Sequence, residues 1–222
     1  MIPVCVFAKP FIAGQVKTRL EPVLGPKRAA DLAAAMFFDV WPAVSSCPGV
    51  RPILATLQPE SQCTGDASAK YFVQVPAEDI WMQGDGDLGA RLERVFRDGL
   101  ATAPAAIAVG ADSPLLTSAH LQQAMQALAN HDAVIGPCPD GGFYLLALRA
   151  CPQGLLSGLP WSTPETAEAT KRRLNARGFS LLELEPLFDV DTPDDLAQLG
   201  GSLSGQPAIA PATRAWHRDN NF

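Results

Sequence analysis

Basic charge, paired cysteines and long apolar runs are all scarce in this chain of 222 residues. Its 17 Lys and Arg are outnumbered by 23 Asp and Glu, which gives a formal net charge of −6. Because nucleic-acid-binding proteins usually present a basic patch, this balance argues against that class of partner. Only 18% of the residues are charged, so cations that gather beside one loop are informative.

Signals for export or membrane insertion are also missing. No stretch reaches the roughly 20 apolar residues that a membrane-spanning helix needs. The N-terminus has neither a basic flank nor a long apolar run, so no signal peptide is expected. The five cysteines are odd in number and lack a Cys-x-x-Cys spacing, which favours reduced thiols. Together these features predict a cytoplasmic protein.

What is present is an alternation of strand-like apolar runs with helix-like periodic segments. We expect strands at residues 3–8, 52–56, 71–75, 105–109, 133–136, 143–148 and 180–184, and helices at 26–45, 89–102, 118–130, 164–177 and from Pro193. The alternation predicts an α/β fold with three layers, α/β/α, and a mostly parallel sheet. The connection from 136 to 143 is too short for a crossover helix, so that strand pair is expected to be antiparallel and the sheet mixed.

The chain length fits one domain, which we place at residues 1–199. Residues 200–222 are rich in Gly, Ser, Ala and Pro without a period, so we expect a loosely ordered tail with Trp216 as its candidate anchor. No internal repeat is visible.

The first strand opens onto a loop that gathers cations. Residues 2–8 are followed by Lys9, Gly14, Lys17 and Arg19. At such a loop, backbone N–H groups and a helix N-terminus favour an anion, and the cations neutralise it. The segment after Gly14 is superficially similar to a Walker A loop but lacks the earlier glycine, which argues against a P-loop ATPase. The pattern predicts a nucleotide or phosphate site, with an ordinary solvated loop as the alternative.

Carboxylates follow two extended segments. Asp112 ends the apolar run 105–109, where it can hold a hard cation such as Mg²⁺ or Mn²⁺ or merely cap an Asp-Ser-Pro turn. Asp189 and Asp191 project to one side of an extended segment, and two like charges there favour a cation between them. With Asp112 they are candidates for one metal site, whereas the next two aspartates fit the first turn of a helix.

Two glycine-rich turns and one tryptophan are further candidates. Asp140, Gly141 and Gly142 form a turn, and Asp140 is a candidate to bind a sugar or acceptor hydroxyl, although turn chemistry alone also explains it. Gly86 and Asp87 precede Arg91, which can pair with a phosphate or with Asp87. Trp161 either covers the active site or packs at a helix entry. We assign no role to the histidines, which are His120, His131 and His217.

In combination these motifs resemble one family. The order is Phe7-Ala8-Lys9-Pro10, Lys17-Thr18-Arg19-Leu20, Gly86-Asp87-Leu88-Gly89, Asp112-Ser113-Pro114, Asp140-Gly141-Gly142-Phe143-Tyr144, Pro160-Trp161-Ser162-Thr163 and Asp189-Val190-Asp191-Thr192-Pro193. It resembles the DUF2064 family, also called glycosyltransferase-like or radical-SAM/selenodomain-associated transferase 1, from the first strand to about Leu199. The family is similar to nucleotide-diphospho-sugar transferases of the GT-A (Rossmann-like) fold, and more distantly to guanylyltransferases for phospholactate and molybdopterin.

The resemblance implies a nucleotide at the first loop and a divalent metal, Mg²⁺ or Mn²⁺, on Asp112 and Asp191. The expected nucleotide-binding residues are Ala8, Lys9, Gly14, Lys17, Arg19, Gly86, Asp87 and Arg91. The expected substrate-binding residues are Asp140, Gly141, Gly142 and Trp161, and the expected catalytic residues are Lys17, Asp112 and Asp140. One departure is Gly110, where an Asp-x-Asp pair would have its first carboxylate, and this favours a nucleotidyltransferase-type arrangement.

Three functions remain open at this point. The first is metal-dependent transfer of a glycosyl group from a nucleotide-diphospho-sugar to a small-molecule acceptor. The second is nucleotidyl transfer, in which an NTP is joined to a phosphorylated small molecule and pyrophosphate is released. The third is a non-catalytic nucleotide binder. The base, the sugar, the acceptor and the oligomeric state are not readable from the residues.

Overall fold

The computed structural model describes residues 1–57, 75–204 and 208–221. Within these ranges seven strands form one sheet in the order β3-β2-β1-β4-β6-β5-β7. The strands are β1 (Ile2–Phe7), β2 (Val50–Thr56), β3 (Ile80–Met82), β4 (Ala106–Gly110), β5 (Ala133–Pro137), β6 (Phe143–Leu148) and β7 (Leu181–Glu183). Only β6 runs antiparallel to its neighbours β4 and β5. The expected α/β fold with a mixed, mostly parallel sheet is confirmed.

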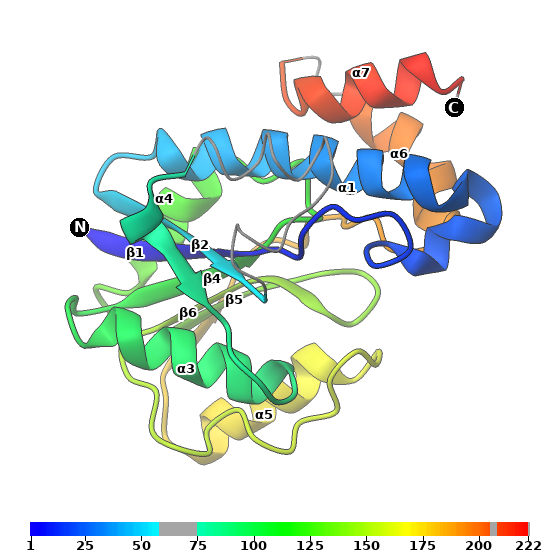
Figure 1. Cartoon of the computed structure of the whole chain (residues 1–222). Coiled ribbons are helices and arrows are strands. Elements are labelled where there is room, and N and C mark those ends of the chain that lie inside the picture. The colour runs from blue at the N-terminus through cyan, green and yellow to red at the C-terminus, as the bar shows by residue number, and fades with distance from the viewer. Residues whose placement is uncertain (58–74, 205–207, 222) are drawn as a thin grey trace.

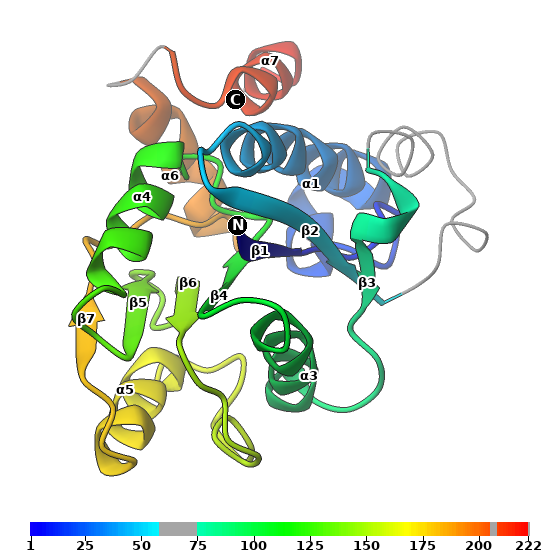
Figure 2. The same ribbon diagram turned by 90° about the vertical axis from the view of Figure 1, so that its left-hand side faces the viewer.

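Helices cover both faces of the sheet (Figures 1 and 2). They are α1 (Glu21–Ser45), α3 (Leu88–Leu100), α4 (Ser118–Ala127), α5 (Thr166–Ala176), α6 (Pro193–Ser204) and α7 (Pro211–Asp219). Side chains of α1 and α4 pack on one face, around Phe37 and Leu121. Side chains of α3 and α5 pack on the other, around Phe96 and Leu174. This is the three-layer arrangement that the sequence predicts.

Strand β1 occupies the centre of the sheet because its side chains are buried on both sides. Val4 and Val6 face the α1 layer, whereas Cys5 faces the opposite layer. β1 pairs in parallel with β2 on one side and with β4 on the other. The order of the strands therefore reverses between β1 and β4, and α/β proteins bind ligands in the crevice at such a point.

Several boundaries differ from those expected. The first long helix begins at Glu21 rather than residue 26, with Gly25 in a left-handed conformation (φ 72°) just before Pro26, so the chain kinks where the prediction started. The three-residue edge strand β3 is missed, because so short a run gives no periodic signal. Of the strand expected at 71–75, residues 71–74 lie outside the described residues, as does Cys63; the other four cysteines are free thiols.

The C-terminal segment is not the loose tail that its composition suggests. α7 lies along α1 in Figure 1, and Trp216 packs against the leucines of α1 and α6. Asp39, within α1, accepts hydrogen bonds from the backbone N–H groups of Ala212 and Thr213 at 2.9 and 2.8 Å. A carboxylate from another helix thus satisfies the first turn of α7, which no local pattern in residues 200–222 reveals. The expected anchor role of Trp216 agrees with this packing.

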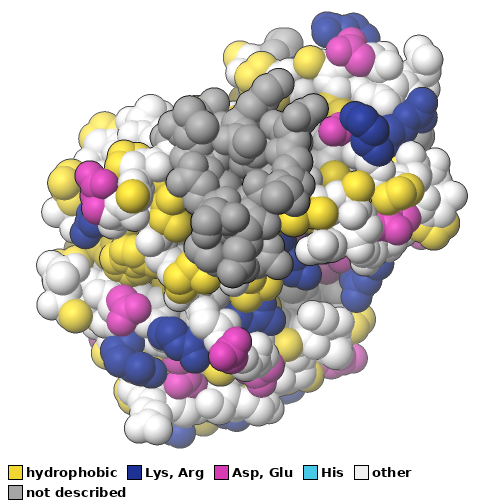
Figure 3. Space-filling view, viewed as in Figure 1, with side chains coloured by type: hydrophobic (Ala, Val, Ile, Leu, Met, Phe, Trp, Pro, Cys, Tyr) yellow, Lys and Arg dark blue, Asp and Glu magenta, His cyan; other side chains and the backbone are white. Residues whose placement is uncertain are grey.

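No helix in the described part of the chain combines the length and apolarity needed to cross a membrane. On the face shown in Figure 3, the visible Lys and Arg side chains are interspersed with Asp and Glu. That surface does not resemble the one-sign basic patch of a nucleic-acid-binding protein.

Candidate active site

A cleft of about 450 Å³ opens at the carboxyl ends of β1 and β4. Its lining is contributed by the loops after β1, β4 and β5, by the entry to α5 and by the segment before α6. The lining residues are Phe7, Arg19, Leu88, Gly110, Asp112, Asp140, Gly142, Phe143, Trp161, Ser162, Thr163, Pro164, Thr166, Asp189, Asp191 and Thr192. An adjoining cavity of about 180 Å³ shares Phe7, Asp112 and Asp191 and adds Lys9 and Lys17.

Lys17 joins the two carboxylates that were expected to hold a metal. Its Nζ lies 3.0 Å from Asp112 Oδ2 and 3.2 Å from Asp191 Oδ1, and its side chain is only 8% exposed. Arg19 Nη1 lies 2.8 Å from the other oxygen of Asp191. These residues are separated by up to 174 positions in the chain, so the fold has brought the cationic loop and the late acidic segment to one place.

The positive charges of this cluster and its two carboxylates stabilise one another. Burial alone lowers the pKa of Lys17, but the charges of Asp112 and Asp191 outweigh it and hold that pKa above its ordinary value. Burial raises the pKa of Asp191, but Lys17 and Arg19 overcome this and hold it low. Lys17 and Asp191 are therefore both charged at neutral pH.

The backbone explains how the cluster is held. Lys17 has a left-handed conformation (φ 50°), which is uncommon for a residue with a side chain. It lies at the N-cap of the short 3₁₀ helix Thr18–Leu20. The N–H of Val190 donates to the carbonyl of Asp112, which ties the late acidic segment to the end of β4. Thr192 and Asp195 exchange hydrogen bonds at the start of α6. The expected helix-start role of Asp195 is thus seen directly.

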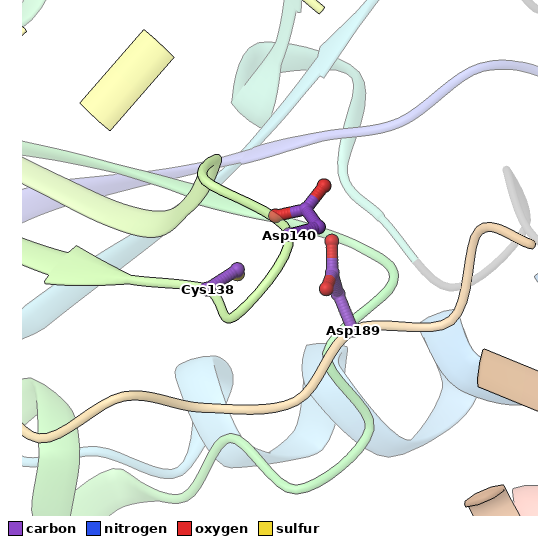
Figure 4. Close-up of side chains that lie close together, drawn as sticks. All are labelled: Cys138, Asp140 and Asp189. Carbon is purple, nitrogen blue, oxygen red and sulfur yellow. The ribbon is translucent and has the colours of Figure 1, made fainter. Parts of the chain in front are cut away.

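A second acidic group lies beside the first. One sulfur or carboxylate oxygen from each of Cys138, Asp140 and Asp189 lies within 4.8 Å of the other two. Figure 4 shows these three side chains close together. Burial, followed by the nearby charges of Asp112 and Asp140, raises the pKa of Asp189 to about 7. Burial also raises the pKa of the Cys138 thiol. This group is a second set of residues that could hold a metal ion, and the motif containing Cys138 gave no signal of it.

Two glycines are required by close approaches within the site. A Cβ added to Gly110 would lie 2.6 Å from Asp112 Oδ1, so a side chain here would displace that carboxylate. Gly141 has φ +89°, and an added Cβ would lie 1.9 Å from the carbonyl oxygen of Pro164. The N–H of Gly142 donates to Asp140 Oδ1 at 2.7 Å. The turn-chemistry interpretation of this segment is therefore correct, and the same turn brings Asp140 to the cleft.

The wall opposite the cations is aromatic. Phe143 and Trp161 meet edge to face, with ring centroids 6.1 Å apart. Phe7, at the end of β1, and Leu88, at the start of α3, also line the cleft. Sequence reasoning assigned no role to Phe7, Leu88 or Phe143, because an apolar residue at a strand end or helix start reads as core.

Other expected residues lie outside the lining of these cavities. Asp87 accepts a hydrogen bond from the N–H of Ala90 and so caps α3. Arg91 donates to the backbone carbonyls of Gly86 and Asp87, in place of the expected Asp87 salt bridge. Ala8 is buried and pairs with the backbone of β2, and Gly14 is exposed with φ 83°. The lining does include the other expected residues except Gly141, and these are Lys9, Lys17, Arg19, Asp112, Asp140, Gly142, Trp161, Asp189 and Asp191.

Comparison with known proteins agrees with the motifs. Residues 54–163 match the model of the family DUF2064, described as an uncharacterized protein conserved in bacteria. This match confirms the resemblance drawn from the sequence. No curated protein matches the chain.

Solved structures share the fold. A protein from Desulfovibrio desulfuricans G20, provisionally named a nucleotide-diphospho-sugar transferase, is 25% identical with a TM-score of 0.85, over 99% of this chain and 94% of its own. A CMP:2-keto-3-deoxy-manno-octonic acid synthetase complexed with CTP is 18% identical with a TM-score of 0.56, over 93% and 100%. Rv0371C from Mycobacterium tuberculosis H37Rv, in complex with manganese, is 17% identical with a TM-score of 0.50, over 91% and 100%. The first carries a name in the transferase class that the sequence predicts for this chain.

Proposed function

We propose that this chain is a transferase that binds a nucleotide at the cleft and moves the glycosyl group of a nucleotide-diphospho-sugar to a small-molecule acceptor. The observation that carries the proposal is the convergence of Lys17 and Arg19 with Asp112 and Asp191 at the point where the strand order reverses. Cations at this position suit the phosphates of a nucleotide. The name of the Desulfovibrio protein supports the same class of donor.

Asp112 and Asp191 fit a divalent metal. Their oxygens converge on one cation, the ammonium of Lys17, at 3.0 and 3.2 Å, and carboxylate oxygens are the ligands that Mg²⁺ and Mn²⁺ prefer. When bound, such an ion would stabilise negative charge on a departing diphosphate. The manganese complex of a protein with the same fold supports this assignment.

The residues of the chain have separate tasks in this proposal. Lys17 and Arg19 neutralise the phosphates, and removing one such donor typically lowers the rate by about 10²–10³. Asp140, whose Oδ1 is fixed by the N–H of Gly142, orients a hydroxyl of the sugar or acceptor with its other oxygen. Trp161 and Phe143 provide an apolar wall that limits access of water to the reacting groups.

Nucleotidyl transfer is the second candidate, because Gly110 leaves a single carboxylate at the end of β4. A Cβ at that position would lie 2.6 Å from Asp112 Oδ1, so an Asp-x-Asp pair here would require the Asp112 carboxylate to move. The CTP complex of a protein with the same fold supports this alternative. Here an NTP would be attacked at its α-phosphate and pyrophosphate would leave.

Product analysis distinguishes the candidates. Wild-type protein is incubated with Mn²⁺ and panels of nucleotide sugars or NTPs, each with candidate acceptors. Release of a nucleoside diphosphate from a nucleotide sugar supports glycosyl transfer, and pyrophosphate release from an NTP supports the alternative. Nucleotide binding with neither product would favour a non-catalytic binder.

Replacement of Asp112 tests the site itself. Asp112→Asn is expected to lower turnover at least about 10²-fold while the protein remains folded, because it keeps the shape of a partly exposed side chain and Asp191 still pairs with Lys17. Asp194→Asn, at an exposed position in the first turn of α6, is the matched control. Unchanged turnover in Asp112→Asn would contradict the proposal.

A further inference from the structure

Some of the charged side chains that line the cleft form ion pairs, and others do not. Lys17 and Arg19 pair with Asp112 and Asp191 at 2.8–3.2 Å. Asp140 and Asp189 also line the cleft, but neither forms an ion pair with any residue that the structure describes. The half of the cleft beneath Asp140 and Asp189 therefore keeps negative charge after the other half has been neutralised.

The helix terminus beside these carboxylates does not offset their charge. The entry to α5 lines the cleft, and an open helix N-terminus would favour an anion. Here two of its donors are already used: the N–H of Ala167 donates to the Gly141 carbonyl at 2.8 Å, and the N–H of Thr166 donates to the Thr163 carbonyl at 3.1 Å. The Gly141 carbonyl, rather than a ligand, meets this end of the helix.

Part of the remaining lining is apolar. Trp161 and Phe143 face the same cavity as Asp140 and Asp189, and Leu88 extends that wall. An ionised carboxylate can only accept hydrogen bonds, so a ligand here must donate them. A phosphate group offers acceptor oxygens and negative charge, and it would meet both repulsion and unpaired acceptors.

We infer that the part of the cleft between Asp140, Asp189 and the Trp161–Phe143 wall binds a hydroxyl-rich group that donates hydrogen bonds and carries no phosphate of its own. This inference rests on the proposed function, in which the nucleotide phosphates lie on the Lys17 side. It specifies the second substrate as a non-anionic sugar or polyol. It therefore excludes a phosphorylated acceptor at this position.

The electrostatic part is tested with charged thiol reagents. Ser162 is exposed on the cleft wall, so Ser162→Cys places a thiol there. Its rates of modification by cationic and anionic methanethiosulfonates are measured, with the wild-type background subtracted. The matched control is Ser46→Cys, at the exposed end of α1 near the start of β2. We expect the cationic-to-anionic rate ratio at Ser162→Cys to exceed the control ratio about tenfold.

Neutral variants identify the source of that preference. Adding Asp140→Asn and Asp189→Asn to Ser162→Cys is expected to remove most of the tenfold difference; Asn at 140 keeps an oxygen for the Gly142 N–H. A ratio at Ser162→Cys equal to the control ratio, or unchanged by the two Asn substitutions, overturns the inference.

The ligand class is tested by protection. Sugars and polyols, and their phosphate esters, are compared for how far they slow cationic modification of Ser162→Cys. The parent compounds are expected to protect better than their esters, and an ester that protects better than its parent overturns the inference. Calorimetric binding of nucleotides in the same preparation tests the proposed function separately. A strong cationic preference without any nucleotide binding would overturn the proposed function alone.

Discussion

Lys17 is the residue on which the site depends most. Its ammonium lies between Asp112 and Asp191, where a bound metal ion would lie, and its backbone is held in a left-handed conformation. A buried lysine is costly unless it is paired, and here two carboxylates supply the compensation. The ammonium and a divalent ion would therefore compete for the same oxygens until nucleotide phosphates attract the lysine away.

This competition predicts the behaviour of Lys17→Met. Without the ammonium, the two carboxylates repel each other and are free to accept a cation. We expect Mn²⁺ to bind Lys17→Met about tenfold more tightly than wild type in the absence of nucleotide, measured by calorimetry. Lys27→Met, which removes an exposed lysine paired with Asp31 on α1, is the control. Equal Mn²⁺ affinities in all three proteins would contradict the idea that the Lys17 ammonium and the metal ion compete for the same position.

Ionisation of Asp189 is expected to destabilise the folded protein as the pH rises, whereas a carboxylate with a lowered pKa would stabilise it. Its pKa is raised to about 7, first by burial and then by Asp112 and Asp140, whereas an unfolded aspartate titrates near 4. Folding therefore opposes ionisation of Asp189, and the resulting loss of stability grows from about pH 4 until it levels off above pH 7. Asp189→Asn should raise the melting temperature more at pH 8 than at pH 5.

Thermal unfolding of Asp189→Asn and wild type at both pH values checks this sign. Asp194→Asn, at an exposed helix start, should show the same small difference at pH 5 and pH 8. If the stabilisation by Asp189→Asn were equal at the two pH values, Asp189 would not be the titrating group.

At the scale of elements, α7 is attached through a carboxylate rather than through its own sequence. Asp39 of α1 is 7% exposed and accepts the N–H groups of Ala212 and Thr213 in the first turn of α7. Burial raises the pKa of Asp39, and the hydrogen bonds from Thr213 and Ala212 oppose that shift. The Asp39 carboxylate, which accepts both hydrogen bonds, thus caps the N-terminus of α7 although it belongs to another helix.

Removal of this cap has a predictable cost. Hydrogen bonds to charged groups contribute about 1.5–3 kcal/mol each, so Asp39→Ala is expected to lower the free energy of unfolding by about 3 kcal/mol in urea denaturation. Asp31→Ala, which breaks only the exposed pair with Lys27 on the same helix, should change it by less than about 1 kcal/mol. Equal effects of the two substitutions would mean that α7 does not depend on Asp39.

The elements that sequence could predict are those with strong local signals. Continuous apolar runs and a helical period identify β1, β4, β6 and α3 nearly to the residue, and the short turn at Asp140 correctly predicts that β6 is antiparallel. β3 and α7 are missed. β3 is too short for a period to show, and α7 is stabilised by Asp39 and Trp216 through long-range contacts.

At the scale of the whole molecule, the sequence likewise predicts one part of the site and not the contacts that complete it. The carboxyl ends of parallel strands meet at one edge of the sheet. This rule alone predicts that the loop after β1 lies near Asp112. The sequence also identifies Asp191 as acidic and extended. It could not show that Lys17 bridges Asp112 and Asp191, or that Cys138 approaches Asp189, because side-chain contacts between residues far apart in the chain depend on how the loops fold.

The whole arrangement makes the cleft asymmetric, with cations on the β1 side and unpaired carboxylates beside an aromatic wall on the other. In the proposed function, this asymmetry would orient a two-part ligand, with its phosphates toward Lys17 and Arg19 and a hydroxyl-rich group toward Asp140 and Trp161. The fold alone, shared with other transferases and synthetases, does not determine this orientation.

Calorimetry of nucleotide binding tests the central claim most directly. Nucleotide sugars and NTPs are titrated with Mn²⁺ into wild type, into Lys17→Met/Arg19→Met, and into Lys27→Met/Arg28→Met, which removes the same charge from the exposed surface of α1. We predict a single nucleotide site whose affinity falls at least about tenfold in the first variant and is unchanged in the second. Equal affinity for the nucleotide in all three proteins would contradict a nucleotide site at this cleft.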